Sequence, residues 1–435
     1  MNPTNITDVS ESLMCSNCGA CASICPTEAI SFKFTNIGRY PAIVDEQKCI
    51  SCKLCRKVCP SLDLQDTHST FKDPFVGDVR EVYVGKSTYE ELFLNAQSGG
   101  AVTTILKYLF EQKEIQAALV VEQKFGNPPV IYPKIVTSIH QLKATQKSCY
   151  TPVSLLSALR DMKDYENIAV VGLPCHLEGV ELLNRLKRFT NIKFRLGLIC
   201  DKTLCNTIQN VFIKISNIPP NYFLVWKHKL FRTNKLTYLY KNAPVTVQNS
   251  DGIIKVYPNS YRFALRDLFT PPRCWVCYDK INVFADIVFG DPWRMPDTDE
   301  KKGSSLIVTR TPLGSKIIEE LSSKKMIVLS QRPSVQLLKG QIIDSRRDQV
   351  ASYSKAINQI PVKIESYLYN QEENRPINSK YLKFAQKTIK EFIYLEKKPR
   401  NYIVKKAISV IRKENIKRKL HYNSIKLRIH KLIGK

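Results

Sequence analysis

The chain has 435 residues, of which 43% are hydrophobic and 24% are charged; this is the balance of a globular protein of two or three domains and excludes a disordered or fibrous chain. No apolar run approaches the roughly 20 residues of a membrane-spanning helix, and the polar N-terminus lacks the basic and apolar regions of a secretory signal. We therefore expect a cytoplasmic protein. Two features of the sequence are unusual, a net charge of +27 and 14 cysteines.

Two cysteine runs with identical spacing open the chain. The first is Cys15, Cys18, Cys21 and Cys25, and the second is Cys49, Cys52, Cys55 and Cys59. In bacterial two-cluster ferredoxins with this spacing, three neighbouring thiolates bind one cube and the fourth binds the other, whereas zinc sites use four ligands, commonly as paired CxxC units. We therefore predict two 4Fe-4S clusters. Cys15, Cys18, Cys21 and Cys59 hold the first, and Cys49, Cys52, Cys55 and Cys25 hold the second.

Strand-like and helix-like segments alternate from residue 80 to residue 220. The expected strands are 81–87, 117–123, 167–175 and 193–200, and the expected helices are 98–113, 153–162 and 177–189. Because strands that alternate with helices form parallel sheets, this part of the chain predicts an α/β core with a parallel sheet.

The segment 221–272 interrupts this alternation. It is rich in Tyr, Phe and Thr and has poor helical periodicity, so we predict a β-rich insertion. Strand character returns at 284–293 and 305–311, and a helix with proline in its first turn is expected over 311–325. The polar segment 63–79 is predicted to be a linker between the N-terminal module and this core.

The C-terminal stretch is strongly basic. Between Lys383 and Lys435 there are 17 Lys and Arg residues and 3 Glu, a net charge of +14. Apolar residues fall on one helical face twice, at Ile403, Val404, Ala407, Ile408 and Ile411 and again at Ile425, Ile429, Leu432 and Ile433. Such a helix can lie on an anionic membrane surface, bind an acidic partner or nucleic acid, or pack on its own domain. We expect no nucleic acid, and peripheral membrane contact stays an open alternative.

Two candidate sites lie next to predicted strands. Ser98, Gly99 and Gly100 open a helix whose backbone N–H groups can face a phosphate, although a tight helix start would have the same sequence. Gly172, Pro174, Cys175 and His176 follow the carboxyl end of a strand, where α/β sheets bind ligands. His176 is a candidate catalytic proton donor, and capping of the following helix is the alternative.

Two more groups lie further along the chain. Cys200 ends a strand and Cys274 and Cys277 form a CxxC pair, so with Cys175 they can make a third four-cysteine site; free thiols or zinc are the alternatives. Asp291 belongs to an FGDPW stretch, where an aromatic ring can stack on a cofactor or join the core. A polar loop with Gly303, Ser304 and Ser305 follows.

Together, these residues resemble the family of coenzyme F-420 hydrogenase/dehydrogenase beta subunits. The matching motifs are SGGAVT (98–103), GLPC (172–175), GLIC (197–200), CWVC (274–277), ADIVFGD (285–291) and KGSSLIVTRT (302–311). The resemblance covers about residues 80–330. Members of the family bind FAD and iron–sulfur clusters. They include deazaflavin reductases of methanogens, the plant 7-hydroxymethyl chlorophyll a reductase, and proteins encoded in bacterial polysaccharide gene clusters.

The resemblance implies two sites. Ser98, Gly99 and Gly100 look like part of an FAD pyrophosphate site, to which the family pattern adds Tyr150, Gly172, Pro174, Asp291, Gly303, Ser304 and Ser305. Cys175, Cys200, Cys274 and Cys277 look like the ligands of a third 4Fe-4S cluster near the flavin, with Cys205 as a competitor for the fourth ligand. The family often has Gly-Ser-Lys-Tyr where this chain has 147–150, and Gln where it has His176; both departures speak against a deazaflavin substrate.

These observations predict four parts. They are an α+β two-cluster ferredoxin-like domain over 1–65, an α/β flavin-binding part over 80–220, a part with the CxxC and GDPW motifs over 221–345, and a basic helical tail over 346–435. We expect an oxidoreductase that passes electrons between a ferredoxin-like donor, the 4Fe-4S clusters, FAD and a small organic acceptor, with polysaccharide biosynthesis as one setting. The alternatives are an electron-transfer subunit without its own substrate and an F-420 reductase or dehydrogenase. Membrane association on the cytoplasmic face would follow if the tail binds lipid.

Overall fold

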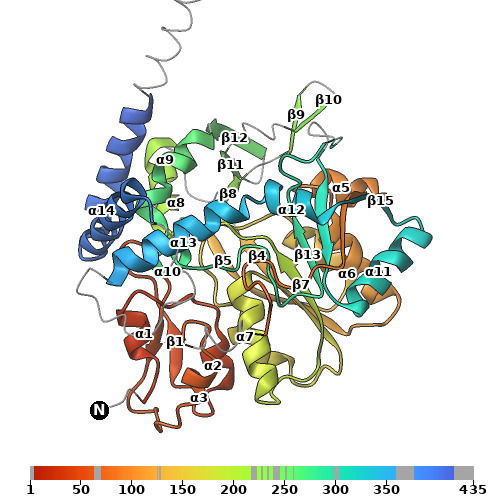
Figure 1. Cartoon of the computed structure of the whole chain (residues 1–435), viewed down its shortest axis with the longest axis horizontal. Helices are drawn as coiled ribbons and strands as arrows, with labels where there is room; N and C mark the ends of the chain where they lie inside the picture. The colour runs from red at the N-terminus through yellow and green to blue at the C-terminus, as the bar shows by residue number, and fades with distance from the viewer. Residues whose placement is uncertain are drawn as a thin grey trace, which may run out of the picture.

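The computed structural model describes most of the chain (Figure 1). The residues that stay undescribed are 1–3, 63–69, 125, 127–128, 217–222, 227–228, 233–234, 239–244, 250–251, 258, 297, 299–302, 359–376 and 416–435. The second apolar face of the basic tail, at Ile425, Ile429, Leu432 and Ile433, therefore lies outside the described residues, as does the first half of the predicted linker.

An eight-stranded sheet forms the centre of the molecule, in the strand order β15-β3-β14-β13-β7-β6-β4-β5. Its strands are β3 (Glu81–Ser87), β4 (Ala117–Lys124), β5 (Val130–Val136), β6 (Ile168–Gly172), β7 (Ile192–Leu198), β13 (Ile287–Gly290), β14 (Ser305–Thr309) and β15 (Ile327–Arg332). β6 (IAVVG) and β14 (SLIVT) are almost entirely buried. This burial follows because helices cover both faces of the sheet.

The sheet is mixed, so the prediction of a parallel sheet is correct only for its central strands. β4, β6, β7 and β13 run parallel to one another. β5, β14, β3 and β15 are antiparallel to their neighbours. A parallel pair needs a long crossover, usually a helix. β4 reaches β5 through residues 125–129 alone, and the described part of the connection from β13 to β14 holds no helix, so both pairs turn back antiparallel.

Two helices pack on one face of the sheet and a larger group on the other. The first face carries α6 (Ala101–Glu111) and α11 (Pro312–Ser323). The second carries α7 (Pro174–Arg185), the 3₁₀ helix η2 (Leu155–Met162), α12 (Ser334–Gly340) and α13 (Ile343–Asn358). Short helices α5 (Glu90–Asn95) and η1 (Ile139–Thr145) lie in connections. η2 corrects the predicted α-helix over 153–162, since this segment is a 3₁₀ helix; the Leu156 amide in its first turn donates to the Cys18 carbonyl at 2.9 Å.

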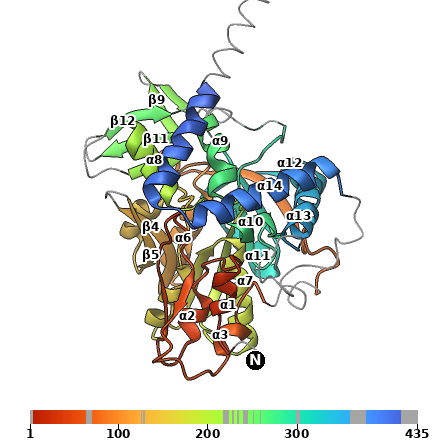
Figure 2. The same cartoon turned by 90° about the vertical axis from the view of Figure 1, so that its left-hand side faces the viewer.

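The N-terminal module packs against α7 and η2 (Figure 2). Its elements are α1 (Thr7–Glu11), α2 (Ala20–Ile24), β1 (Ile30–Phe32), β2 (Ala42–Val44) and α3 (Leu54–Lys57). Gly19 enters α2 with a φ of 95°, and a Cβ at this position would lie 2.5 Å from the Ser157 amide nitrogen. Only glycine permits this approach, which brings the first cysteine run against the central domain.

The predicted β-rich insertion contains two small antiparallel sheets, followed by helices. One sheet has β8 (Phe223–Trp226), β11 (Val245–Asn249) and β12 (Gly252–Tyr257), and the other has β9 (Lys229–Arg232) and β10 (Lys235–Tyr238). Its end corrects the prediction, since 259–269 forms α9 (Asn259–Phe269) and α10 (Pro272–Trp275) comes next. Tyr261, Leu265, Leu268 and Phe269 recur at helical spacing and pack into one core, a local period that the composition of the longer segment conceals.

The described part of the basic tail is helical and packs on its own protein. α14 (Ser379–Glu396) and helical residues 400–415 lie against α9 and α8 (Thr207–Ser216). Ile403, Ala407 and Ile411 are at most 3% exposed. The first apolar face of the tail is therefore covered by protein and is not available to a membrane. None of the described helices is long and apolar enough to cross a bilayer.

A buried ion pair ties the tail to the N-terminal module. Both Nε and Nη2 of Arg39 donate to Glu396 Oε1, at 2.9 and 2.6 Å, and the two side chains are 8% and 16% exposed. Replacing Glu396 with alanine is expected to lower the free energy of unfolding by about 3 kcal/mol, because the Arg39 charge stays buried without its partner. Urea denaturation followed by circular dichroism measures this loss.

The matched control is Glu391→Ala on the same helix. Glu391 pairs with Lys406 at 3.0 Å, but these side chains are 31% and 41% exposed, so the expected loss is below about 1 kcal/mol. Equal losses in the two variants would contradict a role of Arg39–Glu396 in holding the module to the tail.

Candidate functional site

The structure brings the cysteines of the two runs together across the runs. Cys25 from the first run lines one cavity with three cysteines of the second, Cys49, Cys52 and Cys55. Cys52 is exposed at the surface, whereas Cys55 is buried. Burial, with the neighbouring Cys52 thiol, raises the pKa of Cys55 to about 11.

Cys59 from the second run joins the first. Burial raises the pKa of Cys59, and the Cys18 and Cys15 thiols beside it act in the same direction. The pKa of Cys21 is raised by burial and by Cys18, Cys15 and Cys59. The structure thus brings together cysteines that the spacing groups, and their role as ligands of two clusters stays a prediction. Because iron binding displaces thiol protons, these raised pKa values mean that assembly of a cluster here releases protons.

A third set of four cysteines surrounds a larger cavity. Cys175 lies in the first turn of α7, Cys200 follows β7, Cys274 belongs to α10 and Cys277 comes just after it; all four line this cavity, whose volume is about 810 Å³ including the part open to solvent. Burial raises the pKa of Cys175, Cys200 and Cys277, and in each case neighbouring thiols of the same set contribute.

The competing residue Cys205 lies elsewhere. It is fully buried in an apolar cluster with Leu204, Ile208 and Val211, and its amide donates to the Phe269 carbonyl at 2.7 Å. A fifth thiol, Cys149, does line the cavity, and burial raises its pKa to about 12. Sequence reasoning missed it as a cavity residue, although its place in the departure at 147–150 was a signal.

The four cysteines of the third set line a cavity. Among the described residues, no group of three or more His, Cys, Asp or Glu side chains is arranged to hold a single metal ion. A zinc ion needs four ligands about 2.0–2.3 Å from one centre, whereas thiolates around an iron–sulfur cube stand apart by the width of the cube. A third 4Fe-4S cluster at these four cysteines stays a prediction, with free thiols or zinc as its alternatives.

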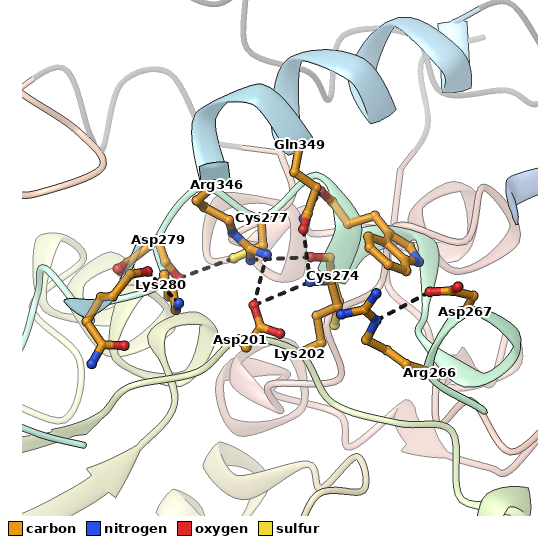
Figure 3. A network of polar contacts seen from close by, with 12 residues as sticks. Asp201, Lys202, Arg266, Asp267, Cys274, Cys277, Asp279, Lys280, Arg346 and Gln349 are labelled. Carbon is orange, nitrogen blue, oxygen red and sulfur yellow. Dashed lines mark hydrogen bonds and ion pairs between the residues drawn. The ribbon is translucent and has the colours of Figure 1, made fainter. Parts of the chain in front are cut away.

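Charged side chains that line this cavity belong to a network of polar contacts (Figure 3). Lys202 Nζ lies 3.3 Å from Asp201 Oδ1, and Arg346 Nη1 lies 3.8 Å from the same oxygen. Burial lowers the pKa of Lys202 to about 8, although Asp201 opposes the shift. Burial raises the pKa of Asp201, but Lys202 and Arg346 outweigh it and hold this pKa below its usual range. Asp201 lines the cavity, and its side chain is 56% exposed.

His176 caps a helix. Its Nδ1 accepts from the Leu173 amide at 3.1 Å, and the side chain is buried at the edge of the cavity. Burial lowers the pKa of His176 to about 4, so the ring is neutral near pH 7. A neutral ring with Nδ1 occupied has its remaining proton on Nε2, which has no hydrogen-bond partner among the described residues. The capping alternative accounts for its geometry, and a catalytic role stays a prediction.

The residues predicted to bind FAD form a second cluster beside the cavity. Ser98 Oγ donates to Asp291 Oδ1 at 2.5 Å, and the Gly99 amide donates to Ser305 Oγ at 3.0 Å. Gly303, with a φ of 89°, and Ser304 lead into β14 just before Ser305. The glycines precede the helix, because α6 begins at Ala101 with Gly100 as its N-cap.

Of three further predicted residues, only one lines the cavity itself. Pro174 lines it, and Gly172 ends β6 two residues earlier, where its carbonyl accepts from Asn282 Nδ2 at 2.9 Å. Tyr150 is not among the described residues that line the cavity; its ring lies under Arg262 at 5.3 Å. The residues predicted to bind FAD adjoin the cysteine cavity. The amide of Ser148, which precedes the cavity residue Cys149, donates to Oε1 of Gln97 at 3.0 Å, and Gln97 directly precedes Ser98.

The cavity also touches the N-terminal module. Ser16 and Asn17, which lie between Cys15 and Cys18, line it opposite the sheet. α7 passes so close that a Cβ on Gly179 would lie 3.6 Å from Cys18 Sγ. The third set of cysteines is therefore the neighbour of the first set, and the second set lies towards the surface.

Family models match most of the chain. The N-terminal model for the coenzyme F420 hydrogenase/dehydrogenase beta subunit matches residues 82–160, and the model for its C terminus matches 165–334. The chain belongs to the family of coenzyme F420 hydrogenase/dehydrogenase beta subunits. A 4Fe-4S dicluster model matches residues 14–62, so the predicted family and ferredoxin-type domain are both confirmed.

Two related proteins align with most of this chain. One is a subunit of the F(420)H(2) dehydrogenase of Methanosarcina mazei, which is 25% identical over 365 residues that span 82% of this chain and 95% of the relative. The other is the coenzyme F420-dependent sulfite reductase of Methanocaldococcus jannaschii, which is 26% identical over 344 residues that span 77% of this chain and 50% of the relative.

One solved structure shares the fold. A chain of the F420-reducing NiFe hydrogenase complex from Methanosarcina barkeri aligns with a TM-score of 0.53 at 18% identity, over 69% of this chain and 99% of that chain. The α/β core therefore has the same fold as that chain of the hydrogenase complex. The 4Fe-4S dicluster match makes the protein an iron–sulfur member of an oxidoreductase family.

Proposed function

We propose that the chain is an iron–sulfur flavoprotein oxidoreductase in which three 4Fe-4S clusters connect the protein surface to an FAD site at the carboxyl edge of the sheet. The observation that carries the proposal is the third cysteine cavity. It adjoins Cys18 of the N-terminal module on one side and the SGG loop, through Gln97 and Ser148, on the other.

The order of the sites gives electrons a route. The exposed Cys52 makes its cluster the outer end, the group with Cys18 comes next, and the set with Cys175 is innermost. Iron–sulfur clusters exchange single electrons, and a flavin converts single electrons into the two-electron or hydride chemistry of an organic molecule. The direction of flow follows from the partners, not from the fold.

The chain's own residues would hold the flavin in two ways. The amides at the start of α6 favour a pyrophosphate, because the N-terminus of a helix carries partial positive charge. Val121, Val171 and Leu198 from three neighbouring parallel strands give the cavity an apolar wall suited to a flat ring system. Ligands of α/β sheets bind at this edge.

A protein partner follows from the exposed outer end. The M. mazei relative is named as a dehydrogenase subunit, and the structural neighbour is part of a hydrogenase complex. We propose a redox partner protein such as a ferredoxin at the Cys52 edge and a small-molecule substrate at the flavin. The second candidate function, an electron-transfer subunit of a larger complex, rests on these same relatives. No residue of the site points to polysaccharide biosynthesis, and that setting is not part of the proposal.

The test is the cofactor content of the anaerobically purified chain. Iron, acid-labile sulfide and released flavin are measured per chain, and three cubes correspond to about 12 irons. About 12 irons with one FAD is the expected result. About 8 irons without flavin would overturn the flavoprotein proposal and leave a two-cluster electron carrier.

Gly99 offers a separate test of the flavin site. A Cβ at this residue would lie 2.5 Å from the Gly85 carbonyl oxygen and 2.6 Å from the Ser305 amide nitrogen, so Gly99→Ala must push the SGG loop away from β3 and β14. We expect the dissociation constant for FAD to rise at least tenfold, measured by fluorescence of released flavin. The iron content should stay unchanged, because no cysteine moves. Unaltered FAD binding would contradict the assigned site.

A further inference from the structure

Two buried guanidinium groups face the third cysteine cavity. Arg273 of α10 and Arg346 of α13 both line it and are 2% and 4% exposed. Within the described part of the chain, Nη1 and Nη2 of Arg273 and Nε and Nη1 of Arg346 have no hydrogen-bond partner. A buried donor without a partner is destabilising, and more so when it belongs to a charged group. Buried donors of this kind call for an acceptor that occupies the cavity.

The two arginines differ in what else they contact. Nε of Arg273 donates to Ser61 Oγ at 3.0 Å, two residues after Cys59. Its charge acts on Cys59 of the first set and on Cys277 and Cys175 of the third, and it also interacts with the buried carboxylate of Glu178. Arg273 therefore lies between the two cluster sites.

Arg346 contacts the third set. Its Nη2 lies 3.4 Å from the Cys274 carbonyl oxygen, and its charge acts on Cys200 and Cys277. Nη1 also faces Asp201 at 3.8 Å, on the side of the cavity shown in Figure 3. The interactions of Arg346 thus centre on one cluster site, whereas those of Arg273 reach two.

We propose that Arg273 and Arg346 are positioning residues that donate their free N–H groups to the sulfurs of the third cluster and raise its reduction potential, and that Arg273 does the same for the first cluster. This inference rests on the third cluster of the proposed function. A reduced cluster is more negative than an oxidised one, so a buried cation and its hydrogen bonds stabilise the reduced form. Arg273 then raises the reduction potentials of the first and third clusters together, whereas Arg346 raises that of the third cluster alone.

The experiment compares Arg273→Gln with Arg346→Gln in redox titrations of the full chain followed by electron paramagnetic resonance, with iron counted in each sample. Arg346→Gln should lower the potential of the third cluster alone. Arg273→Gln should lower those of the first and third clusters. The expected change is at least tenfold in the ratio of reduced to oxidised cluster at fixed potential, which is about 59 mV for one electron.

Two further variants keep the result decisive. Arg188→Gln on the exposed surface removes the same charge far from hydrogen-bond reach of any cysteine set and should shift no potential. Arg273→Lys keeps the charge but not the planar fork, so it should assemble all clusters and show a smaller shift in the same direction. Three clusters with unchanged potentials in Arg273→Gln, or in Arg273→Lys if the glutamine variant loses iron, would overturn the inference. A wild-type chain with two clusters would instead refute the proposed function.

Discussion

Replacing Cys200 with serine is expected to remove about one third of the iron from the anaerobically purified chain, since loss of one ligand empties one of three proposed cubes. Cys200 is the sharpest choice among the four. It follows β7 directly, and after burial the Cys274 and Cys277 thiols contribute most to raising its pKa. The backbone around it is held independently of any cluster, because the Cys200 amide donates to the Lys280 carbonyl at 2.9 Å.

The matched control is Cys205→Ser, five residues away. Cys205 is fully buried, whereas Cys200 is only partly buried, and Cys205 packs among Leu204, Ile208 and Val211 outside the cavity. Its serine variant should lose some stability, from burying a hydroxyl, and keep all of its iron. Iron loss in Cys205→Ser with none in Cys200→Ser would reverse the ligand assignment, and equal iron in both variants and the wild type would mean that the cavity holds no cluster.

The same variant tests the electron route. If the third cluster joins the first to the flavin, Cys200→Ser should slow flavin reduction through the clusters by at least 100-fold, while a hydride donor that meets the flavin directly should still reduce it. Stopped-flow absorbance separates the two. Reduction at wild-type rates by both routes would contradict a place for the third cluster between the module and the flavin.

The sequence was most informative where ligands are close together in the chain. The spacing of the two runs was enough to assign the exchange of Cys25 and Cys59, since a short helical turn after three ligands directs the fourth away. The third set joins positions 175 and 277 through a fold that spacing does not encode, and the family resemblance was needed to group them. Arg273 and Arg346 gave no signal, because their meaning lies in burial that depends on how α10 and α13 pack.

The fold was predicted in the same uneven way. Helices and strands with a clear period, such as α11 and β4, are found within a few residues of the expected bounds. The mixed sheet was missed because strand direction depends on the connections, not on the strands. The basic tail allowed several interpretations until Ile403, Ala407 and Ile411 were seen packed against α8 and α9, a contact between parts of the chain that no local pattern reports.

Replacing Cys25 with serine is expected to empty the outer cluster and disconnect the chain from a protein donor. Cys25 belongs to the first run in sequence, but it lines the cavity of Cys49, Cys52 and Cys55. Because Cys52 is exposed, the proposed outer cluster would be the one nearest to a docked partner. Electron transfer falls steeply with distance, so a donor protein should reduce the variant at least 100-fold more slowly, while dithionite still reduces the remaining clusters.

Comparing the electron paramagnetic resonance spectra of four cysteine variants checks which cysteines bind the same cluster. The paramagnetic resonance spectrum of Cys25→Ser should match that of Cys52→Ser and differ from that of Cys21→Ser, although Cys21 is in the same run. Cys59→Ser should in turn match Cys21→Ser, because Cys59 neighbours Cys18 and Cys15. If the spectra group by run instead, each run binds its own cube. In that case Cys25, which directly follows α2, would not be a ligand of the outer cluster. Arg160 Nη2 donates to the Cys25 carbonyl oxygen at 2.6 Å. That contact ties Cys25, the proposed fourth ligand of the outer cluster, to the central domain.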